Sequence, residues 1–537
     1  MKHCFILLLI ILLSQTVEAQ KYAVFFKDKN GTPYSLSQPE EFLSQRALER
    51  RGKFDISLTD DDLPVNPAYV AALKDAGATV LFSSRWLNCT LIQCTTDVIN
   101  PIKELACVDS VVLVYPHHSS VQPQEEKPVI FNDFPSLKKY DPFYGNASNQ
   151  IEQINGIKLH EKGYEGDGVL IAVLDGGFRN ANTISAFNDL YKSGRLLMAK
   201  DFIEPDGDIY RAGISGHGTN VLSCMAAYLP NQMVGTAPKA SYCLFRTEDT
   251  TSEYIIEEYA WVIGAEAADS IGADLINSSL AYIDYDDPAM SHSYSDMDGQ
   301  TTIASVGARK AVERGVFVCV SAGNDGNNAS WRWIGTPSDV AQALTVGAVQ
   351  SNGQYASFSS IGPNAAGEQK PNVMAQGASA AVVNTEGAVT TSNGTSFSSP
   401  IICGMVACLL QASPFTKPEK LKNAIEASSS FYATPSYQMG YGIPDFYKTL
   451  QSLPVMEHSK CNNILIYPNP VADMLTVKSK NRIEKALLYD VTGRLVVEQS
   501  LPPYNYKIST QKLSSGMYII HFYGENGMTG CAKFIKE

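Results

Sequence analysis

Three polar residues lie far apart in the chain, each in a setting that suits nucleophilic catalysis. Asp175 ends an apolar run and precedes two glycines, His217 lies between two glycines, and Ser396 follows Gly-Thr and leads into an apolar segment. A serine hydroxyl attacks a carbonyl only when a base accepts its proton, and a carboxylate commonly orients that base. The residue types predict acyl transfer, with Ser396 as nucleophile, His217 as general base and Asp175 as orienting carboxylate.

Each of these residues also has a structural interpretation when it is taken alone. Asp175 would start a turn before the glycines, a single histidine is more often structural than catalytic, and Ser396 would be an N-cap, a position that favours serine. The start of a helix, however, also favours developing negative charge, and the glycines beside His217 let other backbone approach its ring. The catalytic hypothesis therefore depends on the joint pattern.

The middle of the chain, residues 151–453, must position these side chains. Strand-like and helix-like segments alternate there, which predicts an α/β fold with a parallel sheet flanked by helices. Asp175 then falls at the carboxyl end of a strand, where open sheets of this kind hold their active sites. The expected strands are 169–174, 242–246, 275–279, 316–321 and 343–349, and the expected helices are 217–228, 255–270, 302–314 and 396–411.

Two smaller units flank this segment. Residues 20–115 predict an α+β domain with strands at 22–26, near Val80, near Leu91 and at 111–114, and helices at 40–50, 66–76 and near Val98. Residues 116–150 lose periodicity and are rich in Gln, Pro, Asn and Ser, which is typical of a linker. Residues 454–537 hold short apolar runs separated by turn signals, which predict a small β-sandwich.

Composition and charge limit the classes of function. A chain of 537 residues with 45% hydrophobic and 18% charged residues predicts several folded domains. A net charge of −13, with no cluster of Lys and Arg, argues against nucleic acid as a partner.

Residues 1–19 have the charge, apolar run and small residues of a signal peptide, with cleavage expected after Ala19. No later segment reaches about 18 uninterrupted apolar residues, so no retained membrane span is predicted. Of the 11 cysteines, Cys4 lies in the signal peptide and the others are scattered singly. They predict no metal site, and those in apolar stretches are expected to be buried thiols.

Together, the three motifs resemble those of the subtilisin-like serine peptidases. The Asp-Gly strand end, His-Gly-Thr and Gly-Thr-Ser follow one another in the order of that family, and Pro400 lies four residues after Ser396. The resemblance covers residues 151–453. It implies a secreted serine endopeptidase that hydrolyses peptide bonds through an acyl-enzyme intermediate and requires no cofactor for catalysis.

The same resemblance implies further site residues. Asn324 would donate its side-chain amide to the oxyanion, beside the backbone N–H of Ser396. Gly335 resembles the floor of the primary pocket, and Ala281 stands where the family usually has glycine, so no side-chain preference is predicted. The edge that pairs with an extended peptide in this family is matched by Ser279, Leu280 and Ala281. Likewise, residues 370–372 read Lys-Pro-Asn where the family commonly has Lys-Pro-Asp, which is expected to alter a structural hydrogen bond.

Both flanking units also resemble known domains. Residues 20–115 resemble the propeptides that template and inhibit these enzymes, which makes 116–150 the expected processing segment. Residues 467–470, 488–494, 513–518 and 533–536 resemble a sorting domain of the type IX secretion system of Bacteroidetes-type bacteria. The implied location is outside a Gram-negative cell, in the medium or on the outer surface. The implied partners are protein or peptide substrates, the chain's own propeptide and the type IX machinery. An accessory carbohydrate-binding or adhesion sandwich is the alternative for residues 454–537.

Two structural questions stay open. The acidic loop 284–287, together with Asp296 and Asp298, offers oxygen ligands for a structural calcium ion, but its spacing does not match an EF-hand and a solvated loop is the alternative. Cys461 and Cys531 flank the C-terminal domain and are candidates for a disulfide in an oxidising compartment.

Three other functions are considered beside the peptidase. A binding protein or adhesin on an inactive peptidase fold would be favoured by a missing triad member. A sedolisin-like peptidase shares Gly-Thr-Ser but uses a glutamate as base, and the setting of His217 argues against it. An α/β-hydrolase esterase would need Gly-x-Ser-x-Gly around its nucleophile, which Ser396 lacks.

Overall fold

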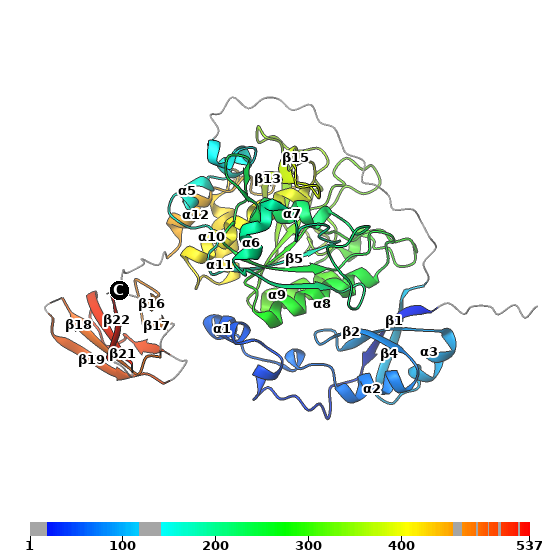
Figure 1. Cartoon of the computed structure of the whole chain (residues 1–537), viewed down its shortest axis with the longest axis horizontal. Helices are drawn as coiled ribbons and strands as arrows, with labels where there is room; N and C mark the ends of the chain where they lie inside the picture. The colour runs from blue at the N-terminus through cyan, green and yellow to red at the C-terminus, as the bar shows by residue number, and fades with distance from the viewer. Residues whose placement is uncertain are drawn as a thin grey trace, which may run out of the picture.

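The computed structural model describes residues 19–116, 141–454, 464–479, 482–491, 493–502, 506–524 and 527–537. Residues 1–18 of the expected signal peptide, most of the expected linker and Cys461 lie outside the described residues. The described chain forms three folded units in sequence order (Figure 1).

The N-terminal unit is a four-stranded antiparallel sheet in the order β2-β3-β1-β4. Its elements are β1 (Gln20–Phe26), α1 (Gln45–Phe54), α2 (Pro67–Asp75), β2 (Thr79–Ser84), β3 (Cys89–Cys94), α3 (Thr96–Lys103) and β4 (Val108–Tyr115). One face of the sheet packs on α2 and α3. The opposite face, with Ala23, Leu91 and Val114, packs on helix α8 (Ile256–Ile271) of the central unit.

The first helix does not lie where the sequence pattern placed it. A helix at 40–50 was predicted, but Pro39–Glu41 form only a short 3-10 turn and α1 begins after Ser44. The Ser44 side chain accepts a hydrogen bond from the Ala47 backbone N–H at 3.1 Å and so caps the later start. The prediction was therefore wrong by about one helical turn.

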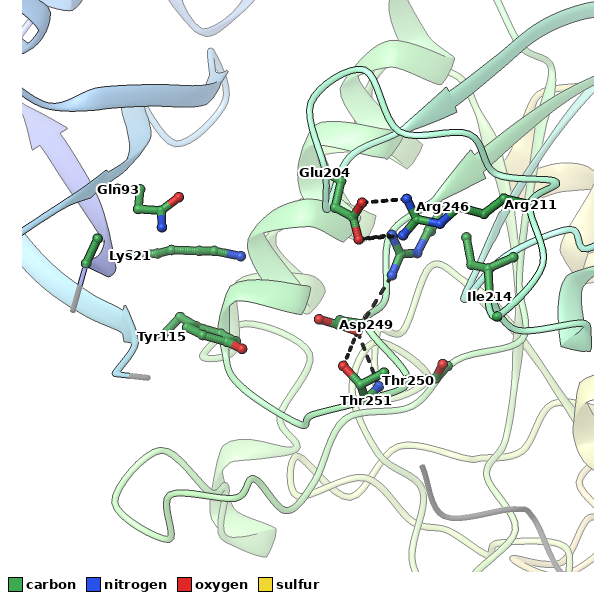
Figure 2. Close-up of a pocket in the computed structure, with 12 residues that line it drawn as sticks. Lys21, Gln93, Tyr115, Glu204, Arg211, Ile214, Arg246, Asp249, Thr250 and Thr251 are labelled. Carbon is green, nitrogen blue, oxygen red and sulfur yellow. Dashed lines mark hydrogen bonds and ion pairs between the residues drawn. The ribbon is translucent and has the colours of Figure 1, made fainter. Parts of the chain in front are cut away.

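A buried ionic cluster joins the N-terminal unit to the central one. Asp269 of α8 is fully buried and accepts hydrogen bonds from Arg50, Arg51 and Arg85. Although burial raises it, these guanidinium groups hold the pKa of Asp269 below its usual range. Glu266 of the same helix accepts from the backbone N–H of Arg85 at 2.9 Å. A pocket of about 510 Å³ remains at another part of this junction, lined by residues of both units (Figure 2).

The central unit is built on a seven-stranded sheet in the order β13-β12-β11-β10-β5-β9-β6, with every neighbouring pair parallel. The predicted α/β fold is thus confirmed. The strands are β5 (Leu170–Asp175), β6 (Leu196–Asp201), β9 (Ser241–Arg246), β10 (Leu275–Ser278), β11 (Phe317–Ser321), β12 (Leu344–Val349) and β13 (Val373–Gln376).

Helices cover both faces of this sheet. Helices α7 (His217–Ala226) and α10 (Thr395–Ala412) pack on one face, and α8 and α9 (Ile303–Glu313) pack on the other. Alternate residues of β5 serve the two faces, since Ile171 belongs to the first cluster and Leu170 to the second. Within the described residues, α10 is the one helix long and apolar enough to cross a membrane, and 94% of that stretch is buried in the protein.

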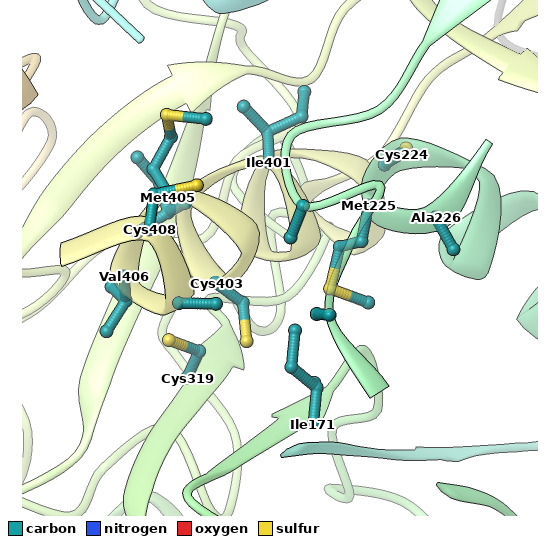
Figure 3. Packing of buried hydrophobic residues seen from close by; sticks show 14 of the residues in the cluster. Ile171, Cys224, Met225, Ala226, Cys319, Ile401, Cys403, Met405, Val406 and Cys408 are labelled. Carbon is teal, nitrogen blue, oxygen red and sulfur yellow. The ribbon is translucent and has the colours of Figure 1, made fainter. Parts of the chain in front are cut away.

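The cysteines of the central unit are part of its apolar core. Cys319 of β11 and Cys403 of α10 point toward each other beside Ile171 (Figure 3). Five cysteines of this unit are fully buried, as predicted: Cys224, Cys243, Cys319, Cys403 and Cys408. Burial raises the pKa of the Cys243 thiol to about 12, so it stays protonated and apolar at neutral pH.

The C-terminal unit consists of two antiparallel sheets with a shared core. One sheet is β16-β17-β20 and the other is β19-β18-β21-β22. Leu475 and Val477 of the first face Leu488, Phe522 and others of the second in one buried cluster. The bounds are β16 (Ile464–Tyr467), β17 (Met474–Ser479), β18 (Lys485–Asp490), β19 (Leu495–Ser500), β20 (Lys507–Ser509), β21 (Gly516–Gly524) and β22 (Gly527–Lys536).

Candidate active site

The carboxyl edge of the central sheet brings Asp175 and His217 together. Asp175 is the last residue of β5 and is fully buried. Its carboxylate accepts hydrogen bonds from Nδ1 of His217 at 2.9 Å and from the Gly176 backbone N–H at 2.8 Å. His217 opens α7, where its own backbone N–H donates to Ser215 Oγ at 3.1 Å. Since Asp175 takes Nδ1, Nε2 is the ring nitrogen suited to accept a proton.

Gly218 permits this close approach. A Cβ at this position would lie 2.5 Å from the Gly177 carbonyl oxygen and 3.0 Å from Cβ of Asp175. Such contacts are far below van der Waals distance, so any side chain here would push α7 away from β5. The glycine beside the histidine is required by packing, which is the physical content of the His-Gly-Thr motif.

Ser396 lies in the first turn of α10 and is 7% exposed. Its Oγ donates to the carbonyl oxygen of Ser279 at 3.4 Å, and Ser279 Oγ donates to the carbonyl oxygen of Ser396 at 2.9 Å. The ring of the next residue, Phe397, lies 5.9 Å from the His217 ring. The imidazole thus lies beside the helix turn that carries the serine hydroxyl.

Asn324 is held at the same helix start. Its Oδ1 accepts from the Thr395 backbone N–H at 2.9 Å and from Thr395 Oγ1 at 3.0 Å. The amide nitrogen lies 3.6 Å from where a Cβ of Gly394 would stand. With the carbonyl side of the amide occupied, the N–H₂ side is left for a ligand.

Sequence reasoning missed Thr395, which orients Asn324. Thr395 is the middle residue of the Gly-Thr-Ser motif, and the motif alone assigns it no role. The sequence does contain a signal for this role, namely a threonine between Gly394 and Ser396 at the expected start of a helix. Thr side chains at helix starts commonly form hydrogen bonds with local backbone and amide groups.

The proposed substrate residues share one wall. Ser279 contacts Ser396 as described, Leu280 is 5% exposed and Ala281 is half-buried. The chain then continues to Tyr282, which pairs with Thr336 through N–H to O bonds of 2.9 and 3.3 Å. Gly335 adjoins this pair, and a Cβ there would lie 2.9 Å from the Ile283 side chain. The structure thus brings Gly335 beside the 279–281 segment.

The carboxylates of Asp296 and Asp298 are satisfied by their own turns. Asp296 accepts from the Ser293 backbone N–H at 2.7 Å, and Asp298 accepts from Gln300 and Thr301 at 2.8 Å each. In the described part of the chain, the acidic group compact enough to surround one ion consists instead of Glu248, Glu253 and Glu257. Sequence reasoning did not single out these glutamates, although they follow strand β9 at the same sheet edge as Asp175.

Comparisons with known proteins match all three units. The subtilase family model matches residues 166–442, a model of the peptidase S8 propeptide domain of Bacteroidota matches 21–128, and a secretion system C-terminal sorting domain matches 465–537. Subtilisin NAT of Bacillus subtilis subsp. natto and subtilisin E of Bacillus subtilis (strain 168) are each 31% identical over 296 residues, which cover 55% of this chain and 68% of each relative.

Solved structures give similar matches. The prenylagaramide maturation protease PagA is 21% identical with a TM-score of 0.43, over 55% of this chain and 97% of that one. MycP1 from the ESX-1 type VII secretion system is 21% identical with a TM-score of 0.45, over 62% of this chain and 94% of that one.

Proposed function

The chain belongs to the subtilase family of serine endopeptidases, and we propose that it hydrolyses peptide bonds through Asp175, His217 and Ser396 by way of an acyl-enzyme intermediate. The observation that carries this assignment is the hydrogen bond from His217 Nδ1 to a fully buried carboxylate, beside the helix turn that holds Ser396. This arrangement fixes the imidazole in the orientation a general base needs.

Acylation uses the three side chains in turn. Ser396 Oγ attacks the scissile carbonyl carbon and gives its proton to Nε2 of His217, while the carbonyl oxygen takes the electron pair of its π bond. The imidazolium, stabilised by Asp175, then donates this proton to the leaving amine as the C–N bond breaks. A water molecule repeats the sequence on the ester, which releases the acid and restores Ser396.

The negative oxygen of the intermediate requires fixed donors. Asn324 Nδ2 and the backbone N–H of Ser396 stand at the start of α10, where the helix dipole also favours negative charge. Thr395 holds the Asn324 amide before the substrate arrives, so little reorganisation is needed when the charge forms. We assign Ser279, Leu280, Ala281 and Gly335 to the wall that positions the substrate.

The flanking matches extend the proposal to the life cycle of the enzyme. A C-terminal sorting domain indicates export, to the cell surface or the extracellular space. We propose that the type IX machinery exports the chain from a Gram-negative cell as a zymogen. The N-terminal domain, which packs on α8, then inhibits the enzyme until the linker is cut and the domain separates.

A serine-directed probe tests the assignment. A fluorophosphonate should label the processed enzyme at Ser396, and Ser396→Ala should abolish both labelling and cleavage of a quenched fluorescent peptide. Ser398→Ala, whose hydroxyl is buried and donates to the Thr395 carbonyl oxygen at 3.0 Å, is the matched control and should still be labelled. Absence of labelling in folded wild type would favour a binding protein on an inactive peptidase fold.

A further inference from the structure

Three glutamates gather at the carboxyl end of β9. Glu248, Glu253 and Glu257 each bring a carboxylate oxygen within 4.8 Å of the other two. Glu253 is exposed, Glu248 is half-buried and Glu257, in the first turn of α8, is 1% exposed. The cluster therefore runs from the surface into the protein.

Two buried polar atoms at this cluster have no hydrogen-bond partner in the described part of the chain. Oε1 of Glu257 accepts from the Asp249 backbone N–H at 2.8 Å, but its Oε2 is unpartnered. Tyr282, which is 2% exposed, has an unpartnered hydroxyl oxygen. Because a buried oxygen without a partner costs free energy, these two atoms point to a ligand that donates hydrogen bonds.

Charge indicates the sign of that ligand. Burial, and then the charges of Glu253 and Glu248, raise the pKa of Glu257. Burial, followed by the charges of Glu248 and Glu257, likewise raises the pKa of the Tyr282 hydroxyl. Several carboxylates crowded in one partly buried place favour a cation among them.

The cations of the catalytic unit near this place are already engaged. Arg246 pairs with Asp201, Glu204 and Asp249 at 3.0, 3.4 and 3.6 Å. Lys21 belongs to the N-terminal domain and points across the junction pocket toward Glu204 and Asp249 (Figure 2). Removal of that domain would therefore withdraw Lys21 and leave the acidic region to a substrate.

The cluster adjoins both the catalytic residues and the proposed substrate wall. A Cβ at Gly176, directly after Asp175, would lie 3.0 Å from Oε2 of Glu248. On the other side, Tyr282 directly follows Ala281, the last residue of the proposed substrate edge. A peptide held against residues 279–281 would thus present side chains to the glutamates.

The N-terminal domain indicates whether the substrate residues beside the glutamates lie before or after the scissile bond. Strand β4 ends at Tyr115, whose ring lies 4.8 Å from that of Tyr254, the neighbour of Glu253. A peptide that ran from Tyr115 to Ser396 would pass the glutamates before it reached the serine. The residues it places beside the glutamates are therefore amino-terminal to the cut.

We propose that Glu248, Glu253 and Glu257, together with Tyr282, form a substrate subsite for a lysine or arginine side chain on the amino-terminal side of the scissile bond. The inference rests on the proposed peptidase function. A guanidinium or ammonium group would donate to Oε2 of Glu257 and to the Tyr282 hydroxyl, and it would neutralise the crowded carboxylates.

The test compares matched peptides. Quenched fluorescent peptides carry lysine, arginine or uncharged norleucine at each of the four positions before the cut, and kcat/KM is measured with the processed enzyme. At one of these positions, kcat/KM of wild type should be about tenfold or more higher for the basic residue than for norleucine. Glu257→Gln keeps the acceptor for the Asp249 N–H and should lose most of that preference, measured as the ratio of kcat/KM for the basic peptide to kcat/KM for the norleucine peptide.

Controls separate a specific effect from damage to the fold. Glu253→Gln, at the exposed end of the cluster, should reduce the same preference and serves if Glu257→Gln fails to fold, which thermal unfolding reveals. Glu419→Gln, an exposed glutamate of helix α11 (Pro418–Ser428), should keep the full preference.

Three outcomes count against the subsite in different ways. If wild type cleaves basic and norleucine peptides equally at every position, the subsite is wrong while the peptidase function stands. If no peptide is cleaved by folded, processed enzyme, the proposed function itself fails. If calorimetry shows saturable calcium binding that Glu257→Gln removes, while the preference for basic peptides is unchanged, the cluster is a metal site and the inference is overturned.

Discussion

Single hydrogen bonds fix the orientation of the His217 ring and the Asn324 amide in the proposed site. Asp175 occupies Nδ1 of the imidazole, and Thr395 occupies the carbonyl oxygen of the Asn324 amide. A motif gives the residue type but not which ring nitrogen or amide atom makes these bonds. The residues of the proposed site could therefore be chosen from the sequence, whereas the part played by Thr395 required the fold.

The triad residues should behave as one unit. Asp175→Asn, His217→Ala and Ser396→Ala should each lower kcat by about 10⁴-fold or more, and double variants should be hardly worse than the weakest single variant, because losing one member disables the others. Peptide hydrolysis by the purified proteins measures this, after the linker of each inactive variant has been cut by an added peptidase that is then removed. Losses that multiply in the double variants would contradict a shared mechanism.

Loss of the Asn324 amide should weaken stabilisation of the transition state without weakening substrate binding. Asn324→Ala should lower kcat by about 10²–10³-fold with KM nearly unchanged, because the oxyanion exists only as the bond forms. Asn327→Ala, an exposed position in the same loop, is the matched control and should keep wild-type kinetics. A rise in KM with unchanged kcat would assign Asn324 to substrate binding instead.

Among the elements of the central unit, strand β13 is preceded by a buried lysine. Lys370 is fully buried, and its Nζ donates to the Val340 carbonyl at 2.6 Å, to Thr345 Oγ1 at 2.8 Å and to Asn372 Oδ1 at 3.2 Å. The amide of Asn372 also donates to Glu426 at 2.8 Å. A carboxylate has no such donor, which explains physically why asparagine suits this chain where the family commonly has aspartate.

This lysine gives a stability prediction with a defined sign. Burial, and then Lys422, lower the pKa of Lys370 from 10.5 to about 7. Between about pH 7 and 10.5 the unfolded chain binds a proton here that the folded chain does not, so this group makes stability rise with pH. Lys370→Met should cost about 2–4 kcal/mol by leaving buried acceptors unpaired.

Urea unfolding in a Ser396→Ala background, which prevents self-digestion, measures both effects. The stability difference between the parent and Lys370→Met should be larger at pH 9.5 than at pH 7.5. Asp339, whose pKa burial raises to about 6, titrates below this window and leaves the comparison intact. If the free energy of unfolding changed equally in the two proteins between these pH values, Lys370 would be excluded as the titrating group.

The predicted elements agree best with the observed ones where a helix or strand is buried in the core of the central unit. Helices α8, α9 and α10 were expected within about two residues of their observed ends, because their apolar residues are continuous or follow the helical period. The edge strands β6 and β13 were missed. Strand β6 is largely exposed, and β13 is short and closely follows Pro371, so neither has the long apolar run that marked the inner strands.

The N-terminal and central units share helix α8. One side of this helix covers the catalytic sheet, and its other side carries Asp269 and Glu266 into the N-terminal domain. A sequence pattern shows that a helix is apolar on more than one side but not which partner covers each side. The contact between domains therefore followed only from the assembled fold.

The cluster around Asp269 should control how firmly the N-terminal domain stays bound. Asp269→Asn would leave Arg50, Arg51 and Arg85 without their shared carboxylate, and loss of one partner from a buried charge cluster is strongly destabilising. After linker cleavage, more of the domain should separate from the enzyme on gel filtration, and inhibition should be relieved sooner. Asp167→Asn, at an exposed loop, is the control. Unchanged retention in Asp269→Asn would show that apolar packing alone holds the domain.

Maturation is the step at which all parts of the chain act together. Strand β4 ends at Tyr115 beside Tyr254, and the described chain resumes at Asp141 in the central unit. The segment that joins the two domains therefore starts beside Tyr254, the sequence neighbour of Glu253 in the subsite that we propose beside the substrate wall. A peptidase of this type acts on extended backbone that can pair with such a wall, and an intramolecular substrate is present at high effective concentration.

We therefore predict that the enzyme cuts its own chain between residues 116 and 150. Wild type should yield a new N-terminus in that range, whereas Ser396→Ala, expressed without other peptidases, should accumulate as a precursor longer by roughly the N-terminal domain. N-terminal sequencing and intact mass measure both products, and Ser398→Ala should mature like wild type because its hydroxyl is not the proposed nucleophile. Equal trimming of Ser396→Ala at the same place and rate would mean that another enzyme performs the cut. In that case the contact between Tyr115 and Tyr254 would serve inhibition rather than delivery of the linker to Ser396.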